Sequence, residues 1–549
     1  MIILCALLSL PPAAAGPAQS LPAAIAAELD AQGLQGAVWS TLEADGRVTL
    51  GAHGVKDARD GSRLAPADRV HVGSIAKTVL AAGVLRLVSE GRFELDTPVS
   101  ELLPEVPIDN PWAATHRMTV RHLLDHTAGL DDARFSQVFS LTATADTPLQ
   151  HALARAGLPL TVRSRPGARH SYSNTGYLVL GMLVEKTTAM RYERYLDTRV
   201  LAPLGMADST AEFTTQAGEA TDRRLALGHF ENGVGQPAVP SYLRPAGQFT
   251  TTAGDMARLA RFLMSDGRID GAPFIDRRLL DAMGRPDGTE AADAGLGVGY
   301  GLGLSTRDRH GAVGKCHGGS TVGFQAMLCM FPEQRQAFFV SVNTDSETAS
   351  YGRLDELFVR ALGLRSADAP PVAAAPMDAS PWLGFYVPSP NRFARLAWLD
   401  ETLNFARLRR HAGGLVFSSL HRPDVALTPE SGALFKASDR TIGSHVLLRA
   451  ADGKRVLSTG TQSFEQVSLP RLMGLWASLA AGLLGLLYVV TAGVGRAVAG
   501  RTRWLGRDSI PAMLAGRRGA RLDVAARAAV LQLCAVLAAW GLLPLRLWA

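Results

Sequence analysis

A serine and a lysine three residues apart give the strongest indication of chemistry in this sequence. Ser74 precedes an apolar, helix-like run, and Lys77 is one of only six lysines in the chain of 549 residues. Positions i and i+3 share a helix face, so the hydroxyl and the amine are expected to face one another. Burial lowers the pKa of an amine because it disfavours the charged form. A neutral Lys77 could then take the proton of Ser74 and make it a nucleophile, while the helix N-terminus favours negative charge on an attacked carbonyl.

Taken alone, this spacing also fits a capping serine and a lysine whose amine reaches solvent. Tyr172 and Asn174, in the stretch SYSNTGY, favour the chemical interpretation. A tyrosine hydroxyl can relay a proton between Ser74, Lys77 and a leaving group. The asparagine amide can orient the substrate and the lysine. Without Ser74 and Lys77, the same stretch would fit a polar turn before a helix.

The stretch GKCHGGSTVGF supplies a third group of candidate residues. His317 lies on a predicted strand and is followed by two glycines, the second of which is Gly319. Glycines allow a substrate backbone to lie close against a strand edge. The N–H of Ser320 could donate to an oxyanion together with the N–H of Ser74. By itself this stretch would also fit a glycine-rich hairpin.

His122 and His126 lie four residues apart in TVRHLLDHTAGL, a spacing that occurs in metal sites. The stretch has no H-E-x-x-H pattern, and no third ligand is evident. We therefore interpret His126 as a structural hydrogen-bonding residue beneath the site. The sequence implies no metal and no organic cofactor.

Strand patterns open and close the first 365 residues, and helical patterns lie between them. Two strands are predicted around an Asp-Gly turn in residues 36–51, and Thr252 and Asp255 have capping-box spacing before a helix. Closing strands are predicted at 300–305, 312–318, 324–331 and 337–343. We expect an α+β domain in which these distant strands meet in one antiparallel sheet flanked by helices.

The composition changes after residue 365. Residues 366–379 are rich in Ala and Pro and are predicted to form a linker. Residues 380–468 show short alternating runs separated by turn signals, which predicts a small all-β barrel or sandwich. No catalytic constellation is evident in that part.

Apolar segments at both ends predict export and membrane anchoring. Residues 1–15 resemble a signal peptide. The runs 472–495 and 528–545 are each long enough to span a bilayer. Between them, residues 496–527 hold eight arginines and two aspartates, which account for the whole net charge of +6. This loop is expected to face the cytoplasm, and the confinement of the charge argues against nucleic-acid binding.

Of the four cysteines, Cys5 lies in the predicted signal peptide and Cys534 in the second predicted span. Cys316 and Cys329 belong to the exported part. They could form a disulfide in an oxidising compartment or act as small apolar residues on neighbouring strands. The sequence leaves both alternatives open.

Four motifs, SIAK, LLDHTAGL, YSN and HGG, occur in an order and spacing that resemble the serine β-lactamase and penicillin-recognising hydrolase superfamily. The nearest branch contains class C β-lactamases, D-aminopeptidases, DD-carboxypeptidases and related esterases. The stretches EGRFELDTPVSELLPE, VLAPLGMADST and RPAGQFTTTAGDMARL support it. The resemblance covers about residues 20–360 and implies a β-lactamase-like fold with an all-helical subdomain.

The resemblance implies that Ser74 is the acylated nucleophile, Lys77 its base and Tyr172 the proton relay. It implies substrate-binding or oxyanion roles for Asn174, His317, Gly319 and Ser320. Many β-lactam-processing members have K-T-G at the third motif, whose cation and hydroxyl help to hold the carboxylate of the drug. This chain has H-G-G, which lacks both and leaves peptide, amide and ester substrates open.

The sequence thus predicts a membrane-tethered periplasmic serine hydrolase that forms an acyl-enzyme on an amide or ester, with a peptide containing D-residues as the favoured substrate. The alternatives are a carboxylesterase or β-lactamase of the same fold, a prodrug-activating peptidase, and a ligand-binding receptor without turnover. The expected partners are a small-molecule or peptide substrate and the membrane. Nothing in the sequence identifies a protein partner.

Overall fold

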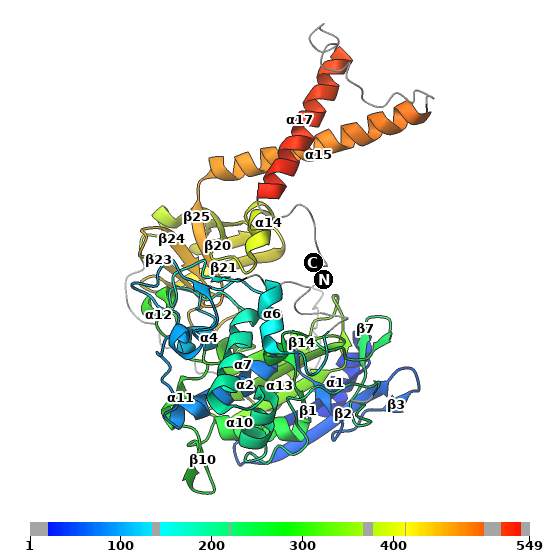
Figure 1. Cartoon of the computed structure of the whole chain (residues 1–549), viewed down its shortest axis with the longest axis vertical. Coiled ribbons are helices and arrows are strands. Elements are labelled where there is room, and N and C mark those ends of the chain that lie inside the picture. Colours follow the sequence, from blue (N-terminus) through cyan, green and yellow to red (C-terminus); the bar gives the residue numbers. More distant parts are fainter. Residues whose placement is uncertain are drawn as a thin grey trace, which may run out of the picture.

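The computed structural model describes residues 20–133, 143–156, 158–218, 221–365, 377–411, 413–498 and 518–539. These residues form a large body, a smaller β-rich body beside it and two long helices at the far end (Figure 1). The predicted signal peptide (1–15) and most of the predicted linker (366–379) lie outside the described residues.

An eight-stranded antiparallel sheet forms the centre of the large body, in the order β12-β13-β14-β15-β16-β1-β2-β3. Its strands are β1 (Gly36–Leu42), β2 (Val48–Asp57), β3 (Ser62–Arg63), β12 (Gly299–Gly301), β13 (Leu304–Arg309), β14 (Ala312–Thr321), β15 (Phe324–Phe331) and β16 (Gln336–Val342). The first strand pairs with β16, so that Ala37 lies opposite Val342. This confirms that strands distant in sequence meet in one sheet.

Alternate side chains of the sheet enter two separate cores, as the period of two along a strand requires. Phe339 of β16 belongs to the larger core, and Phe338 belongs to the smaller one. The larger core includes α2 (Ala76–Ser89), α7 (Asn174–Thr188) and α10 (Ala253–Leu263). The smaller core is closed by α1 (Leu21–Ala31) and α13 (Gly352–Ala361). There Phe338 stacks on Phe358, with ring centroids 4.9 Å apart.

Short elements connect these layers and form the helical part beside the sheet. They are β4 (Val70–His71), η1 (Gly73–Ile75), α3 (Val99–Leu102), β5 (Ile108–Asp109), α4 (Val120–Leu124), α6 (Leu149–Ala156), β6 (Leu160–Thr161), α8 (Tyr192–Tyr195), η2 (Leu196–Leu201), β7 (Gly228–Phe230), β8 (Gly235–Gln236), α9 (Arg244–Gly247), β9 (Thr250–Thr251), β10 (Arg268–Ile269), β11 (Ala272–Pro273), α11 (Arg277–Ala282), α12 (Glu290–Asp293) and β17 (Thr344–Asp345).

The two central helices are buried on all sides. Every residue of α2 from Ala76 to Leu85 and of α7 from Thr175 to Val184 is buried, which is the pattern of a core helix. The side chain of Thr252 accepts a hydrogen bond of 3.3 Å from the N–H of Asp255 and caps α10. The spacing of these two residues had predicted this helix start.

The smaller body is a closed eight-stranded β-barrel, so the structure selects one of the two all-β alternatives. Closure leaves no sheet edge exposed. Its elements are η3 (Ser380–Trp382), β18 (Gly384–Pro388), η4 (Ala394–Leu396), α14 (Ala397–Leu403), β19 (Ala406–His411), β20 (Gly414–Ser419), β21 (Arg422–Ser431), β22 (Leu434–Ala437), β23 (His445–Arg449), β24 (Arg455–Ser458) and β25 (Ser463–Val467).

Polar contacts fix the barrel to the large body. Arg169 makes ion pairs of 2.7 Å with Glu290 of its own body and with Glu465 of the barrel. Asp308 at the end of β13 accepts hydrogen bonds of 2.6 and 2.9 Å from the N–H groups of Thr441 and Ile442. The two bodies are therefore joined by an ion pair and by hydrogen bonds to the carboxylate of Asp308.

Two helices beyond the barrel, α15 (Leu469–Val498) and α17 (Arg518–Ala539), contain segments long and apolar enough to cross a membrane. The second helix starts ten residues before the predicted span 528–545, inside the segment predicted to be an arginine-rich loop (496–527). Alanine and arginine are strong helix formers, so the helix begins before the apolar run does. Residues 540–545 lie outside the described part.

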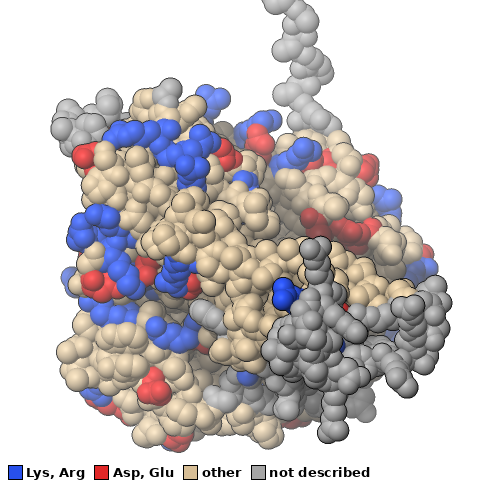
Figure 2. Space-filling model, turned by 90° about the horizontal axis from the view of Figure 1, so that it is seen from above, with Lys and Arg blue, Asp and Glu red and all other residues tan. Residues whose placement is uncertain are grey.

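The first of these helices packs against the barrel where it begins. The indole N–H of Trp476 donates to the carbonyl of Thr402 over 3.0 Å, and its ring lies 4.9 Å from that of Phe405. Viewed from the end that carries the two helices, the molecule has uncharged side chains across the middle and charged side chains mainly around the margin (Figure 2).

Cys316 on β14 and Cys329 on β15 are opposite one another in the sheet register and form a disulfide. This resolves the alternative that the sequence left open. The bond joins strands that are already paired, and it lies one residue from His317 on the wall of the cleft described below.

We expect replacement of both cysteines by alanine to lower the free energy of unfolding by about 2–3 kcal/mol, because the bridge closes a short loop in the unfolded chain. Urea titrations of the oxidised protein, the reduced protein and the variant measure this. Reduction of the parent protein should have the same effect as the double substitution. Equal stability of all three forms would contradict the assignment of the bond.

Candidate active site

Ser74 lies in the single turn η1, two residues before α2 begins at Ala76. The turn packs against the edge of β14, and this contact requires two glycines. A Cβ on Gly73, whose φ is +50°, would lie 2.5 Å from the carbonyl oxygen of Ser320. A Cβ on Gly319 would lie 1.9 Å from the carbonyl oxygen of Val72. The H-G-G motif thus allows the strand edge to approach Ser74.

Lys77 is completely buried and points at Ser74. Its Nζ lies 3.0 Å from Ser74 Oγ and 2.5 Å from the carbonyl oxygen of Ala246. Desolvation lowers the pKa of Lys77 to about 7; the charge of Asp132 opposes this shift and that of Arg392 adds to it. An amine with this pKa is neutral in a large part of the molecules at physiological pH and could accept the Ser74 proton.

Tyr172 covers the lysine. Its ring centroid lies 4.9 Å from Lys77 Nζ, and its side chain is hydrogen-bonded to Ser74. Burial raises the pKa of the Tyr172 hydroxyl above its ordinary value, although the hydrogen bond to Ser74 opposes the shift. The hydroxyl is therefore protonated at rest and lies where it could pass a proton onward from the serine.

His126 holds the segment that carries Tyr172. Its Nδ1 accepts a hydrogen bond of 3.1 Å from the N–H of Ser173, and its ring lies 4.1 Å from that of Tyr172. Desolvation lowers the pKa of His126 well below its ordinary value. His122 instead accepts a hydrogen bond of 3.2 Å from the N–H of Thr119 and caps α4. In the described residues, no three His, Cys, Asp or Glu side chains are grouped as metal ligands.

Asn174 lies at the start of α7 and faces Asp132. Its backbone N–H donates to Oδ1 over 2.6 Å, and its side-chain amide donates to Oδ2 over 3.3 Å. The sequence predicts that Asn174 orients the lysine as well as the substrate, but the amine of Lys77 donates to the carbonyl of Ala246 instead. Asn174 lines the cleft beside Ser74 and is placed to contact a substrate.

His317 carries no charge into the cleft. Nδ1 donates to the carbonyl of Gly318 over 2.6 Å, and Nε2 accepts from the hydroxyl of Tyr300 over 2.9 Å. Desolvation lowers the pKa of His317 to about 3, and the charge of Lys77 adds to the shift. Ser320 follows on the strand edge, and its hydroxyl accepts a hydrogen bond of 3.0 Å from Gln325.

Ser74 opens into two hollows. The larger one, of about 750 Å³, is lined by Tyr172, His317 and Gly319 and extends to Arg392 of the barrel. The smaller one, of about 160 Å³, is lined by apolar side chains such as Phe213 and Val239 and by polar ones such as His71 and Gln248. Ser74, Asn174 and Ser320 border both hollows. A substrate carbonyl at Ser74 could therefore have its two substituents in separate hollows.

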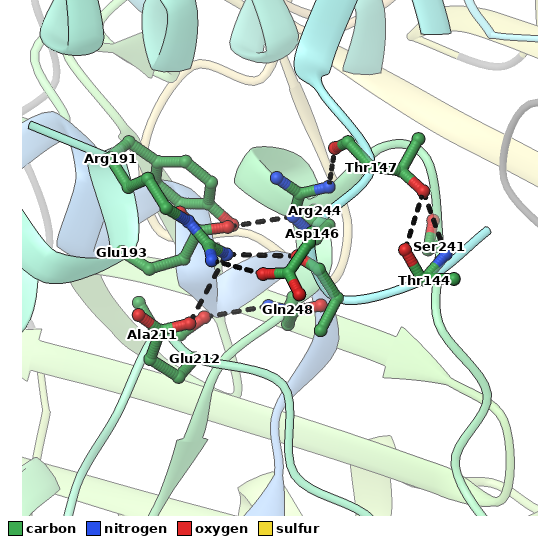
Figure 3. A network of polar contacts seen from close by, with 12 residues as sticks. Thr144, Asp146, Thr147, Arg191, Glu193, Ala211, Glu212, Ser241, Arg244 and Gln248 are labelled. Atoms are coloured by element: carbon green, nitrogen blue, oxygen red, sulfur yellow. Dashed lines mark hydrogen bonds and ion pairs between the residues drawn. The ribbon is translucent and has the colours of Figure 1, made fainter. Parts of the chain in front are cut away.

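A buried ion pair fixes the carbonyl that contacts the lysine. Arg244, at the start of α9, pairs with Glu193 over 2.8 Å, and the two side chains are 3% and 0% exposed. Arg244 also donates to the carbonyl of Thr147 over 2.5 Å. In Figure 3 the Arg244 guanidinium lies between Glu193 and Thr147, surrounded by polar residues from several segments. The network holds α9, and with it Ala246, against Lys77.

The structure brings all seven predicted site residues around one cleft. Sequence reasoning missed four others: Asp132, Ala246, Tyr300 and Arg392. Asp132 follows the LLDHTAGL motif closely, which was the available signal. Ala246 acts through its backbone, and Arg392 comes from another domain, so neither carries a side-chain pattern that a sequence motif could reveal.

The pKa of Lys77 predicts a specific pH dependence of stability. Between its folded value of about 7 and its ordinary value of 10.5, the unfolded chain holds a proton that the folded chain lacks. The free energy of unfolding therefore rises with pH in this window, by up to about 1.4 kcal/mol per unit. Lys77→Met should lose this rise, because methionine does not titrate. The free energy of unfolding of the parent protein should therefore increase relative to that of the variant between about pH 7.5 and 9.5. Urea titrations across this range test it, and parallel curves for the two proteins would contradict a neutral Lys77.

Glu193→Gln should lower the free energy of unfolding by about 3–5 kcal/mol, because it leaves Arg244 as an unpaired buried charge. Glu212→Gln is the matched control, since Glu212 is 43% exposed where it pairs with Arg191 and should lose less than about 1 kcal/mol. Thermal unfolding of both variants measures the difference, and equal losses would contradict the structural role of the pair.

Comparisons with known proteins agree with this geometry. The family described as Beta-lactamase matches residues 21–361. A penicillin-binding protein 4 from Amycolatopsis lactamdurans is 28% identical over 326 residues, which are 57% of this chain and 83% of that protein. The D-amino acid amidase of Ochrobactrum anthropi SV3, crystallised with L-phenylalanine, has a TM-score of 0.50 at 25% identity, covering 62% of this chain and 98% of its own.

A further solved structure, the penicillin-binding protein homologue from Pyrococcus abyssi, has a TM-score of 0.51 at 20% identity and covers 81% of this chain and 99% of its own. That likeness concerns the fold, and it extends beyond the residues that the family matches. The chain belongs to the beta-lactamase family and is a serine hydrolase.

Proposed function

We propose that this protein is a membrane-tethered hydrolase that uses Ser74 as nucleophile to cleave an amide or ester through an acyl-enzyme, with a peptide containing D-residues as the favoured substrate. The observation that carries the proposal is the 3.0 Å contact between Ser74 Oγ and the buried Lys77 amine, whose pKa is lowered to about 7 by desolvation. A serine hydroxyl becomes nucleophilic when such a base is adjacent.

Each step can be assigned to a group in the cleft. Neutral Lys77 takes the proton as Ser74 Oγ attacks the carbonyl carbon. The N–H groups of Ser74 and Ser320 stabilise the oxyanion. Tyr172, protonated at rest, passes a proton to the leaving group. Water then attacks the ester carbonyl, and the same groups return Ser74 to its resting state.

Two observations support an amide or ester substrate over a β-lactam. The third motif carries the neutral His317 instead of a lysine, so the charge that many β-lactam-processing members use is missing there. The solved amidase that resembles this chain acts on D-amino acid amides according to its name. A carboxylesterase, a β-lactamase and a prodrug-activating peptidase remain the alternatives for the same site.

The tether is proposed from the C-terminal helices. Two of them are long and apolar enough to cross a membrane, and the arginine-rich segment between the predicted spans would remain on the cytoplasmic side. The barrel and the catalytic body would then lie on the outer side of the inner membrane, which is also where the predicted signal peptide would direct them.

We expect a fluorescent fluorophosphonate to label the full-length protein on Ser74, with a rate that rises with pH and reaches half its maximum near pH 7 as Lys77 loses its proton. Ser74→Ala should not be labelled, and Tyr172→Phe should turn over substrate about 10²–10⁴-fold more slowly because proton transfer is lost. The mass of the Ser74 peptide identifies the adduct. A folded parent protein that is never labelled would refute the proposal.

Hydrolysis of p-nitrophenyl esters, D-amino-acid amides and nitrocefin ranks the alternatives. Preference for the amides supports the favoured substrate, whereas preference for the esters or nitrocefin selects the esterase or the β-lactamase. Labelling without turnover of any of them would indicate a ligand-binding receptor.

A further inference from the structure

One loop of the barrel, residues 389–394 between β18 and η4, enters the catalytic cleft. Arg163 donates to the carbonyl of Asn391 over 2.9 Å. The N–H of Ala394 donates to Asp131 over 2.8 Å, and the N–H of Asp132 donates to the carbonyl of Arg392 over 3.3 Å. These contacts fix the backbone of the loop, so the position of the Arg392 side chain is determined by the junction of the two domains.

The guanidinium of Arg392 is only partly used. Its Nε donates to Asp132 Oδ2 over 2.6 Å, and its Cζ lies 4.8 Å from the centre of the Tyr172 ring. Its two terminal nitrogens make no hydrogen bond to any residue that the structure describes, and the side chain is 48% exposed on the wall of the larger hollow. The described residues thus leave the two parallel donors of this guanidinium without a partner, and a planar acceptor could bind them.

The other basic groups near Ser74 provide no comparable charge. Lys77 has a pKa lowered to about 7, and those of His170 and His317 are lowered to about 4 and about 3, all chiefly by desolvation. Arg307 also lines the hollow. It lies on the sheet face that carries Cys316, however, because it is opposite Gly314 in the register, two positions before Cys316. Among the residues that the structure describes, Arg392 is therefore the permanent positive charge that lines the hollow on the side of Tyr172.

The neighbourhood of Arg392 also identifies the part of the substrate that it meets. Tyr172, which it contacts, is the group that protonates the leaving group in the proposed mechanism. The smaller hollow also borders Ser74 but does not include Arg392 or Tyr172 in its lining, so it offers a separate space for the acyl substituent. Lys77 Nζ lies 4.9 Å and Arg392 Cζ 4.8 Å from the Tyr172 ring centre. The two groups are therefore at most about 10 Å apart, which is within reach of a short peptide of about 3.5 Å per residue.

We propose that Arg392 binds the free carboxylate of the leaving group, so that the barrel completes the active site and selects peptides that end in a D-amino acid with an unblocked C-terminus. This inference rests on the proposed function and deepens it by naming the substrate class. A planar carboxylate accepts both terminal N–H groups of a guanidinium. The residue that binds the carboxylate would thus come from another domain than the three motifs.

The chemistry balances without any further reactant. The bond between Ser74 Oγ and the acyl carbon forms, and the bond from that carbon to the nitrogen of the terminal residue breaks. The proton of Ser74 passes through Lys77 and Tyr172 to this nitrogen, and the free amino acid leaves with its carboxylate released from Arg392. Water then cleaves the ester to give a carboxylic acid and the resting serine.

The test compares N-acetyl-D-alanyl-D-alanine with its C-terminal amide on the full-length protein in detergent. Two quantities are measured: kcat/KM for each peptide, and the concentration of each peptide that halves the rate of fluorophosphonate labelling. The parent protein should prefer the acid to the amide at least tenfold. Arg392→Gln should lower kcat/KM for the acid about 10- to 100-fold, as expected for the loss of hydrogen bonds to a charged group. It should lower kcat/KM for the amide much less. Arg392→Lys should lie between them.

Arg395→Gln is the matched control, because Arg395 lies three residues further on, is exposed and does not line the hollow. It should behave like the parent protein. The ratio of kcat/KM for the acid to that for the amide separates carboxylate binding from positioning. A displaced Asp132 or a changed pKa of Lys77 would lower kcat/KM for both peptides equally. Loss of a contact with the carboxylate would lower kcat/KM for the acid alone.

Equal effects of Arg392→Gln on acid and amide, or a labelled parent protein without preference for the acid, would overturn the carboxylate assignment and leave the hydrolase proposal intact. A parent protein that is folded but never labelled refutes the hydrolase proposal itself. Because labelling protection reports binding even when neither peptide is cleaved, slow turnover cannot obscure the result.

Discussion

The amine of Lys77 is held out of water beside the hydroxyl of Ser74, and the rest of the active site depends on this placement. Desolvation lowers the pKa of the amine, but burial of an unpartnered amine would be costly. The carbonyl of Ala246 supplies a partner without supplying a full charge. A carboxylate in that place would stabilise the charged amine and remove its ability to act as a base.

Several distant interactions serve this one condition. The apolar helices α2 and α7 exclude water around the lysine. The buried pair of Arg244 and Glu193 fixes the backbone that carries Ala246. The opposing charges of Asp132 and Arg392 act on the amine from the other side and partly cancel. The charged groups around Lys77 thus occur in pairs of opposite sign, and desolvation remains the main influence on the pKa of its amine.

The barrel belongs to this arrangement as well as to the tether. Arg392 of this domain reaches Asp132, while Thr402 of α14 contacts Trp476 near the start of α15. The domain therefore connects the catalytic cleft with the helices proposed to anchor the protein. Directional polar contacts made by Arg169 and Asp308 hold the interface. They therefore fix the orientation of the barrel relative to the large body.

The sequence alone determined the residues whose chemistry is local. Ser74 and Lys77 lie one turn apart, so their spacing predicts that they meet, and the alternation of the strands predicts the sheet. Tertiary structure decided what depends on residues brought together from far along the chain: the hydrogen bond from Lys77 to Ala246, the close approach of Gly73 to Ser320, the Cys316–Cys329 bond, and the position of Arg392 from the barrel. A backbone carbonyl has no sequence signature, and a surface arginine becomes part of a site only through the docking of two domains.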